Sequence, residues 1–126
     1  MEVTIKLGEL VDINRTLKFL IESHDIEMNA LIKFKLLGIM KSIEPTIENF
    51  EIIRNEKIRE FGKEEKDGSI RIAEDDMVAI QKFSDSIKDV INSDIKINIE
   101  KIKASDIFDI GIKTEYLIKL YSIIEE

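Results

Sequence analysis

One stretch of this chain, from Asp25 to Gly62, most constrains what the protein can fold into. Its apolar residues recur at the three- and four-residue spacing of one face of an α-helix. They are Leu31, Leu36, Ile39, Ile43, Ile47, Phe50, Ile53, Ile58 and Phe61. At about 1.5 Å per residue, such a helix would be over roughly 50 Å long, more than a small domain can cover. We therefore expect something else to pack against it.

The only proline of the chain, Pro45, lies inside this stretch. Proline in a helix interior removes one hydrogen bond and clashes with the preceding turn, at a cost of about 3 kcal/mol. The helix therefore either continues with a kink or breaks, so that Pro45 opens a second helix. The apolar spacing keeps its phase from Ile43 to Ile47, which favours a kinked, continuous helix. Asp25 is the expected N-cap, and Gly62 is the expected C-terminal stop.

Two segments alternate apolar and polar side chains, which is typical of half-buried strands. They are residues 2–7 and residues 94–100, and their matching patterns predict that they pair. Gly8 is expected to end the first strand, and a helix is expected over residues 10–22.

The second half of the chain predicts shorter elements. The Asp67-Gly68 turn followed by an alternating Ile70–Ile72 predicts a short strand or a small hairpin. The acidic residues Glu74–Asp76 suit the positive end of a helix that bears Met77 and ends near Asn92.

The C-terminal region predicts a short helical turn at Ser105-Asp106 and a last helix with Thr114 as its N-cap. The expected fold class is α+β, with about four helices, including one long kinked helix, and a small two- or three-stranded sheet. The length of 126 residues fits a single domain, 1–126.

The overall charge limits the classes of partner. The net charge is −7, and lysines and arginines alternate with acids instead of forming a basic stripe, so we expect no direct binding to nucleic acid. The N-terminus lacks the pattern of a secretory signal, and no apolar run approaches the roughly 20 residues that span a bilayer. We expect a protein made in the cytoplasm, without membrane association.

Side chains that carry chemistry are scarce. His24 is the only histidine, there is no cysteine, and the five glycines are scattered. Ser23-His24-Asp25 contains the residue types of a catalytic triad, but neighbours in sequence do not supply triad geometry. We therefore expect a solvated His24, no catalytic or metal-binding residue, no cofactor and no enzymatic activity.

The first half of the long helix is apolar on more than one side, which indicates burial around most of its circumference. Either the rest of the chain surrounds it or a second chain does. In the second case its outward apolar residues form a protein interface. The candidates are Leu31, Phe34, Leu37 and Met40.

Carboxylates are dense from the middle of the long helix to the start of the next one. They form a candidate acidic patch of Glu48, Glu51, Glu64, Glu65, Asp67, Glu74, Asp75 and Asp76. Helix capping and a solvated face explain Glu74–Asp76 better than a cation site does.

The order of these motifs resembles a family of small proteins from phages and prophages of low-GC Gram-positive bacteria, whose function is unknown. The long helix ends in R-x-x-x-I-x-x-[FY]-G, and a D-G-x-[IL]-x-[IVL] turn, a helix with F-x-x-x-[IL], an I-x-I-x-I strand and a final I-I-E-E follow. These motifs fall on Arg54, Ile58, Phe61 and Gly62, on Asp67–Ile72, on Phe83 and Ile87, on Ile95–Ile99 and on Ile123–Glu126. The chain departs from the family in having one Asp-Gly and a shorter loop at the turn. The resemblance implies a phage source, a location in the host cytoplasm or in the virion, and a non-enzymatic character.

Together these features predict a phage-encoded, non-enzymatic protein-binding factor, a small virion structural or assembly component. Its partner would be a phage or host protein or a second copy of itself, so a homo-oligomer is an option. The alternative is an acidic inhibitor of a host defence system or a host enzyme, acting by mimicry of nucleic acid.

Overall fold

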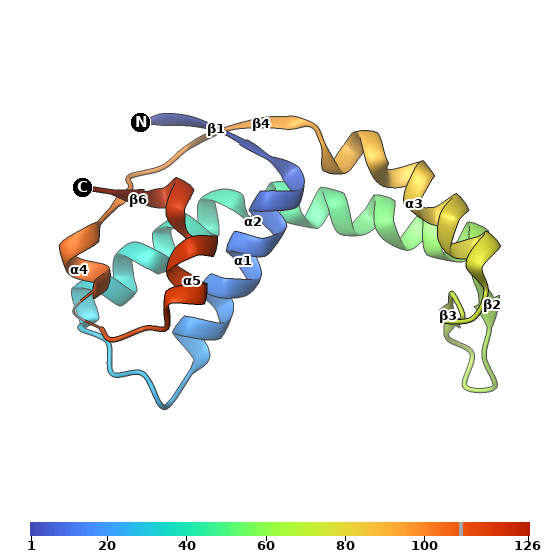
Figure 1. Ribbon diagram of the computed structural model, residues 1–126, viewed down its shortest axis with the longest axis horizontal. Helices are drawn as coiled ribbons and strands as arrows, with labels where there is room; N and C mark the ends of the chain where they lie inside the picture. Colours follow the sequence, from blue (N-terminus) through green and yellow to red (C-terminus); the bar gives the residue numbers. More distant parts are fainter. Residues whose placement is uncertain (109) are drawn as a thin grey trace. The chain divides into compact units, whose positions relative to one another are not determined.

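The computed structural model describes residues 1–108 and 110–126 and has the α+β fold that the sequence predicts (Figure 1). Its described residues include five α-helices, one of them long, against the four or so expected. The elements in chain order are β1 (Glu2–Lys6), α1 (Leu7–Glu22), α2 (Ala30–Phe61), β2 (Lys63–Glu64), β3 (Ile70–Arg71), α3 (Met77–Ile91), β4 (Asp94–Asn98), β5 (Ile102–Lys103), α4 (Ala104–Phe108), α5 (Thr114–Lys119), the 3-10 helix η1 (Tyr121–Ile123) and β6 (Ile124–Glu125).

The chain divides into two compact units, and α2 contributes to both. Unit 1 comprises Met1–Ile47 and Asp94–Glu126, and unit 2 comprises Glu48–Ser93. The prediction of a single domain, 1–126, stays a prediction.

Helix α2 is continuous through Pro45, as the apolar phase from Ile43 to Ile47 predicts, and the alternative of a break at the proline does not occur. The expected start at Asp25 is wrong, because the helix begins at Ala30. Asn29 is the residue that caps it: its side-chain Oδ1 accepts the Leu31 N–H at 2.8 Å, and its carbonyl accepts the Lys33 N–H at 3.0 Å.

The five residues before this cap are not helical. Ile26 and Met28 pack against the core of unit 1, while Glu27 between them is exposed. Side chains that alternate between core and solvent at every second residue are typical of extended backbone. The Asp25 N–H donates to Ser23 Oγ at 3.3 Å, which is a local turn and not the start of a helix.

Helix α1 begins at Leu7, so Gly8 lies inside the helix and the expectation that it separates strand from helix is wrong. Leu7 and Leu10 are both buried and are three residues apart, which places them on the same helix face. The helix then continues this buried face through Ile13, Leu17 and Leu20.

The predicted pairing of the two alternating strands is confirmed. β1 and β4 are antiparallel, with Val3 opposite Ile97 and Ile5 opposite Ile95, and they run side by side in Figure 1. β5 and β6 form another pair of strands, which is parallel and has Ile102 opposite Ile124.

The hydrophobic core lies in unit 1. Its fully buried side chains come from α1, α2, β5, α4 and the C-terminal segment, so residues from both ends of the chain enclose the first half of α2. They are Leu10, Ile13, Leu17, Leu20, Leu36, Ile43, Ile102, Ile107, Leu120 and Ile123.

Unit 2 consists of the second part of α2, the β2–β3 hairpin and α3. The hairpin confirms the Asp67-Gly68 turn, and Gly68 has the positive φ of 87° that glycine adopts most readily. Asp76 caps α3, its carboxylate accepting the Ala79 N–H at 3.1 Å, as the acidic run before this helix predicts.

The C-terminal segment differs from the single helix expected. Thr114 is the first residue of α5 instead of its N-cap, and the capping position falls on Lys113, which makes no side-chain capping bond. The helix ends at Lys119, and the chain continues through η1 into β6. Among the helices in residues 1–108 and 110–126, none has the length and apolarity to cross a membrane.

Candidate protein-binding surface

The first half of α2 has one buried face and one exposed apolar side. Ile32, Leu36, Ile39 and Ile43 follow the helical spacing and are buried in the core of unit 1. Outside this stripe, Leu31 keeps 60% and Phe34 74% of its surface exposed. A phenylalanine that exposed on an ordered helix is an apolar group that nothing in the described chain covers.

The other two predicted interface residues are less accessible. Leu37 and Met40 are half-buried, and Met40 packs against the core of unit 1. The structure therefore places all four candidates on one helix but leaves only Leu31 and Phe34 as prominent exposed side chains.

Phe34 lines a groove of about 740 Å³ in unit 1, here called the α2 groove. One wall is α2 and the other is the chain from the end of β4 through β5, together with Met1 and Glu125. Its lining residues are Met1, Phe34, Lys35, Gly38, Ile39, Ser42, Asn98, Ile99, Glu100, Lys101, Lys103 and Glu125.

The charges around the α2 groove depart from the acidic balance of the chain. Residues 30–43, the first half of α2, hold Lys33, Lys35 and Lys41 and no acid. Lys101 and Lys103 add two cations from the opposite wall, against Glu100 and Glu125. The lining itself therefore combines Phe34 with Lys35, Lys101 and Lys103, here called the lysine rim, against two glutamates, on a protein of net charge −7.

Gly38 is at the centre of the α2 wall of this groove. Apart from the adjoining backbone of α2 itself, no described atom lies within 4 Å of the position that a Cβ would take there, so no packing neighbour requires a glycine. Four residues on, Ser42 Oγ donates to the Gly38 carbonyl at 3.0 Å and turns back onto its own helix. Few side-chain atoms therefore project into the groove at this part of its α2 wall.

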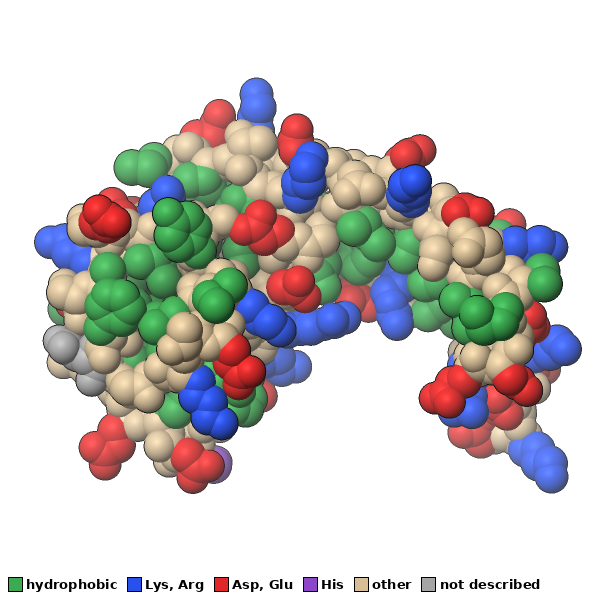
Figure 2. Space-filling view, in the orientation of Figure 1, with side chains coloured by type: hydrophobic (Ala, Val, Ile, Leu, Met, Phe, Trp, Pro, Cys, Tyr) green, Lys and Arg blue, Asp and Glu red, His purple; other side chains and the backbone are tan. Residues whose placement is uncertain are grey.

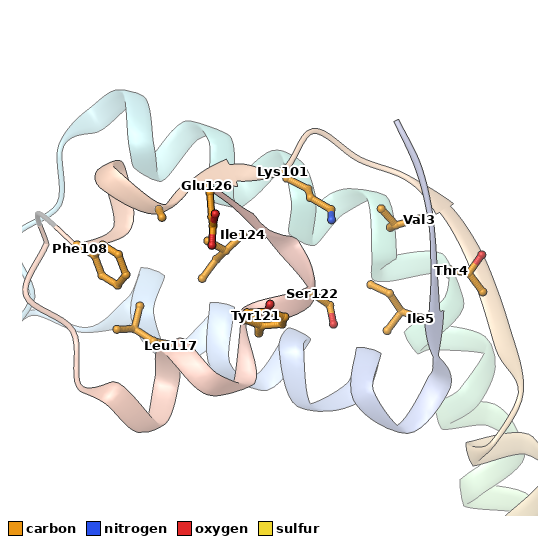
Figure 3. A pocket seen from close by; sticks show the side chains of 11 residues that line it. Val3, Thr4, Ile5, Lys101, Phe108, Leu117, Tyr121, Ser122, Ile124 and Glu126 are labelled. Carbon is orange, nitrogen blue, oxygen red and sulfur yellow. The ribbon is translucent and has the colours of Figure 1, made fainter.

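A second groove, the α5 groove, lies between β1 and the C-terminal segment and encloses about 640 Å³ (Figure 3). Val3 and Ile5 point toward Ser122 and Tyr121 across it, whereas Thr4 points away. Lys101 reaches into both grooves. The α5 groove is lined by Val3, Thr4, Ile5, Lys101, Ala104, Phe108, Leu117, Tyr121, Ser122, Ile124 and Glu126.

Exposed apolar side chains gather over α4 and α5 beside this groove (Figure 2). Phe108 and Tyr121 keep 61% and 79% of their surface exposed, and Ile118 is also exposed. Sequence reasoning missed them, because their short helices give too few turns for the apolar spacing to separate an outward side chain from a core one.

The candidate acidic patch is spread over unit 2. Glu48 and Glu51 are on α2, Glu64 is in β2, Glu65 and Asp67 are in the hairpin turn, and Glu74–Asp76 precede α3. Glu65 pairs with Arg71 at 2.9 Å, and Asp76 caps α3. Residues 48–93 hold twelve acids and eight Lys or Arg, so the basic side chains offset much of the charge.

Asp67 has a structural role in the hairpin turn. Its carboxylate accepts the Ser69 hydroxyl at 2.6 Å and the Ser69 N–H at 3.0 Å. These bonds favour the ionised form, so the side-chain and then the backbone bond from Ser69 lower the pKa of Asp67 below its ordinary value of 3.8.

His24 is exposed in the connection between α1 and α2, as the sequence predicts. Over the part of the chain that the structure describes, no three His, Asp or Glu side chains converge in a way that could hold a metal ion. No protein-family model, no curated protein and no solved structure matches the chain.

Proposed function

We propose that this chain is a phage-encoded, non-enzymatic protein-binding factor, a small structural or assembly component of the virion. The observation that carries the proposal is the exposed Phe34, with Leu31, on the otherwise well-packed first half of α2. Exposed aromatic side chains beside a groove are typical of protein-interaction surfaces. The phage source rests on the family resemblance alone.

The fold around Phe34 is suited to such a role because the surface is rigidly held. The opposite side of the same helix turns carries Ile32, Leu36 and Ile39, which are buried in the core of unit 1. A partner that covers Phe34 would therefore not need to order the helix first, and this lowers the entropic cost of association.

Size-exclusion chromatography with light scattering tests the proposal on the full chain, alone and mixed with the head and tail proteins of its source phage. We expect a complex with at least one of these proteins, or a stable homo-oligomer. A monomer that associates with none of them would refute the proposal.

The acidic inhibitor is the alternative function. Glu48, Glu64, Glu74 and Asp75 of the candidate acidic patch are exposed and could imitate a phosphate backbone. Binding of that kind weakens steeply with added salt. A complex with a host nucleic-acid enzyme that salt disrupts and that Glu74→Lys weakens would favour this alternative.

A further inference from the structure

We infer that the α2 groove binds an acidic, amphipathic segment of the partner protein, whose apolar side chains cover Phe34 and whose carboxylates meet the lysine rim. This inference rests on the proposed function and names the chemistry of the partner. It starts from the combination of a 74% exposed phenylalanine with lysines on both walls of one groove.

The charge of the groove selects the partner. The α2 wall contributes Lys35, with Lys33 and Lys41 on the same helix half, and the opposite wall contributes Lys101 and Lys103. Lys35 Nζ is 3.8 Å from Asp106 Oδ2, which is long for a hydrogen-bonded pair, and its side chain remains 42% exposed. A partner carboxylate would find these ammonium groups accessible.

The same charges disfavour a second copy of this helix face. Two α2 helices laid together at Gly38 would bring lysines against lysines, since this half of the helix carries three cations and no acid. Like charges placed opposite one another cost binding energy. An acidic partner relieves this repulsion.

A nucleic acid fits the groove less well than a protein does. Glu100 and Glu125 line the same groove, and the whole chain carries a charge of −7. A polyanion would meet both repulsions along its length, whereas a short peptide can place its carboxylates only where the lysines are.

Gly38 provides the space. A glycine in a helix interior costs roughly 1 kcal/mol relative to alanine, and no neighbour in the described chain needs it. Along the helix it lies between Phe34 and Ser42, a distance of about 12 Å or two turns. A partner backbone could approach α2 closely at this point, with its apolar side chains beside Phe34.

The test is an mRNA-display selection from an unbiased random peptide library on the full chain, followed by fluorescence anisotropy with the enriched peptides. We expect enriched sequences with apolar residues at helical spacing and a net negative charge. Phe34→Ala should weaken their binding roughly tenfold, the loss of a central aromatic contact. Lys103→Glu should weaken it roughly fivefold or more.

Matched variants separate binding from folding. Tyr121→Ala removes an exposed aromatic from the α5 groove, and Lys96→Glu reverses an exposed lysine on β4, so neither should change the affinity. Gly38→Glu adds bulk and negative charge at the open point of the α2 wall. It should abolish binding while the protein stays at least as stable, because glutamate is a better helix former than glycine.

Enriched peptides that are basic or uncharged, binding that Phe34→Ala and Lys103→Glu leave unchanged, or no enrichment at all would overturn the inference. Tighter binding of a mixed-sequence single-stranded oligonucleotide, weakened by the same variants, would also overturn it in favour of a nucleic acid. A complex with a phage protein that is unaffected by Phe34→Ala would refute the inference but keep the proposed function.

Discussion

Gly38→Ala is expected to stabilise the protein, although it replaces a residue in the middle of its longest helix. The new methyl group would meet no described atom within 4 Å apart from the adjoining backbone of α2, and Gly38 is not among the glycines with positive φ. The substitution therefore changes neither packing nor backbone geometry. What remains is the difference in helix propensity, about 0.8–1.0 kcal/mol in favour of alanine.

Urea denaturation at 25 °C, followed by far-UV circular dichroism, measures this difference. In a separate thermal melt, a gain of about 1 kcal/mol should raise the midpoint temperature by about 4 °C in a chain of this size. The slope of the free energy against urea should stay constant, because the exposed surface on unfolding hardly changes. A destabilised variant would refute the reasoning, since it would mean that a neighbour packs against Gly38.

Gly62→Ala is the matched control and should have the opposite sign. A Cβ at Gly62 would lie 2.5 Å from the Ile58 carbonyl oxygen and 2.9 Å from the Arg71 carbonyl oxygen, both of them backbone atoms. Relief of these overlaps requires α2 and β3 to shift within unit 2. We expect a loss of about 1–3 kcal/mol.

Three further predictions follow from side chains with defined roles. Ile43→Ala, at a fully buried position, should cost about 2–5 kcal/mol of unfolding free energy in urea titrations. Asp76→Ala removes the cap of α3 and should cost about 1 kcal/mol, with faster hydrogen exchange at the Ala79 amide. The lowered pKa of Asp67 means that its contribution to the hairpin is present above pH 3.8 and is lost as the pH falls through the lowered pKa. The Ser69 amide should therefore titrate below pH 3.8 in NMR spectra of the parent chain but not in those of Asp67→Asn.

The sequence predicts the elements in which the apolar spacing of a helix or a strand repeats over many residues. The alternation of β1 and β4 yields both strands and their pairing, and the helical spacing of α3 with its acidic start yields its extent and its cap. The phase of Ile43 and Ile47 correctly predicts that α2 continues past Pro45. Each of these rests on several residues that point to the same structure.

Elements of only two residues cannot be predicted from the spacing of apolar side chains. β5 and β6 have two residues each, so alternation cannot reveal them, and their parallel pairing depends on the tertiary position of the C-terminal segment. The sequence does not fix the start of α2, because Asp25 and Asn29 are both good capping residues. Only the contacts of Ile26 and Met28 with the core decide between them.

The exposure of the four candidate interface residues could be predicted only in part for a similar reason. A helix that is apolar on several sides indicates burial around most of its circumference, but not whether its own chain or a second chain covers each side. Packing in unit 1 covers much of Leu37 and Met40 and leaves Phe34 exposed. The lysine-rich wall opposite Phe34 comes from residues almost seventy positions further along the chain, and only the fold brings them to the same groove.

The central claim is that the exposed Phe34 side of α2 is a protein-docking surface. Its most direct test places the photo-crosslinker benzoylphenylalanine at position 34 of the full chain, expressed in the cells that naturally produce it, with position 96 as the control outside both grooves. The account predicts a specific adduct with one protein from position 34 alone, attached within an acidic segment of that protein. Equal labelling from both positions, or an adduct of position 34 with nucleic acid alone, would contradict it.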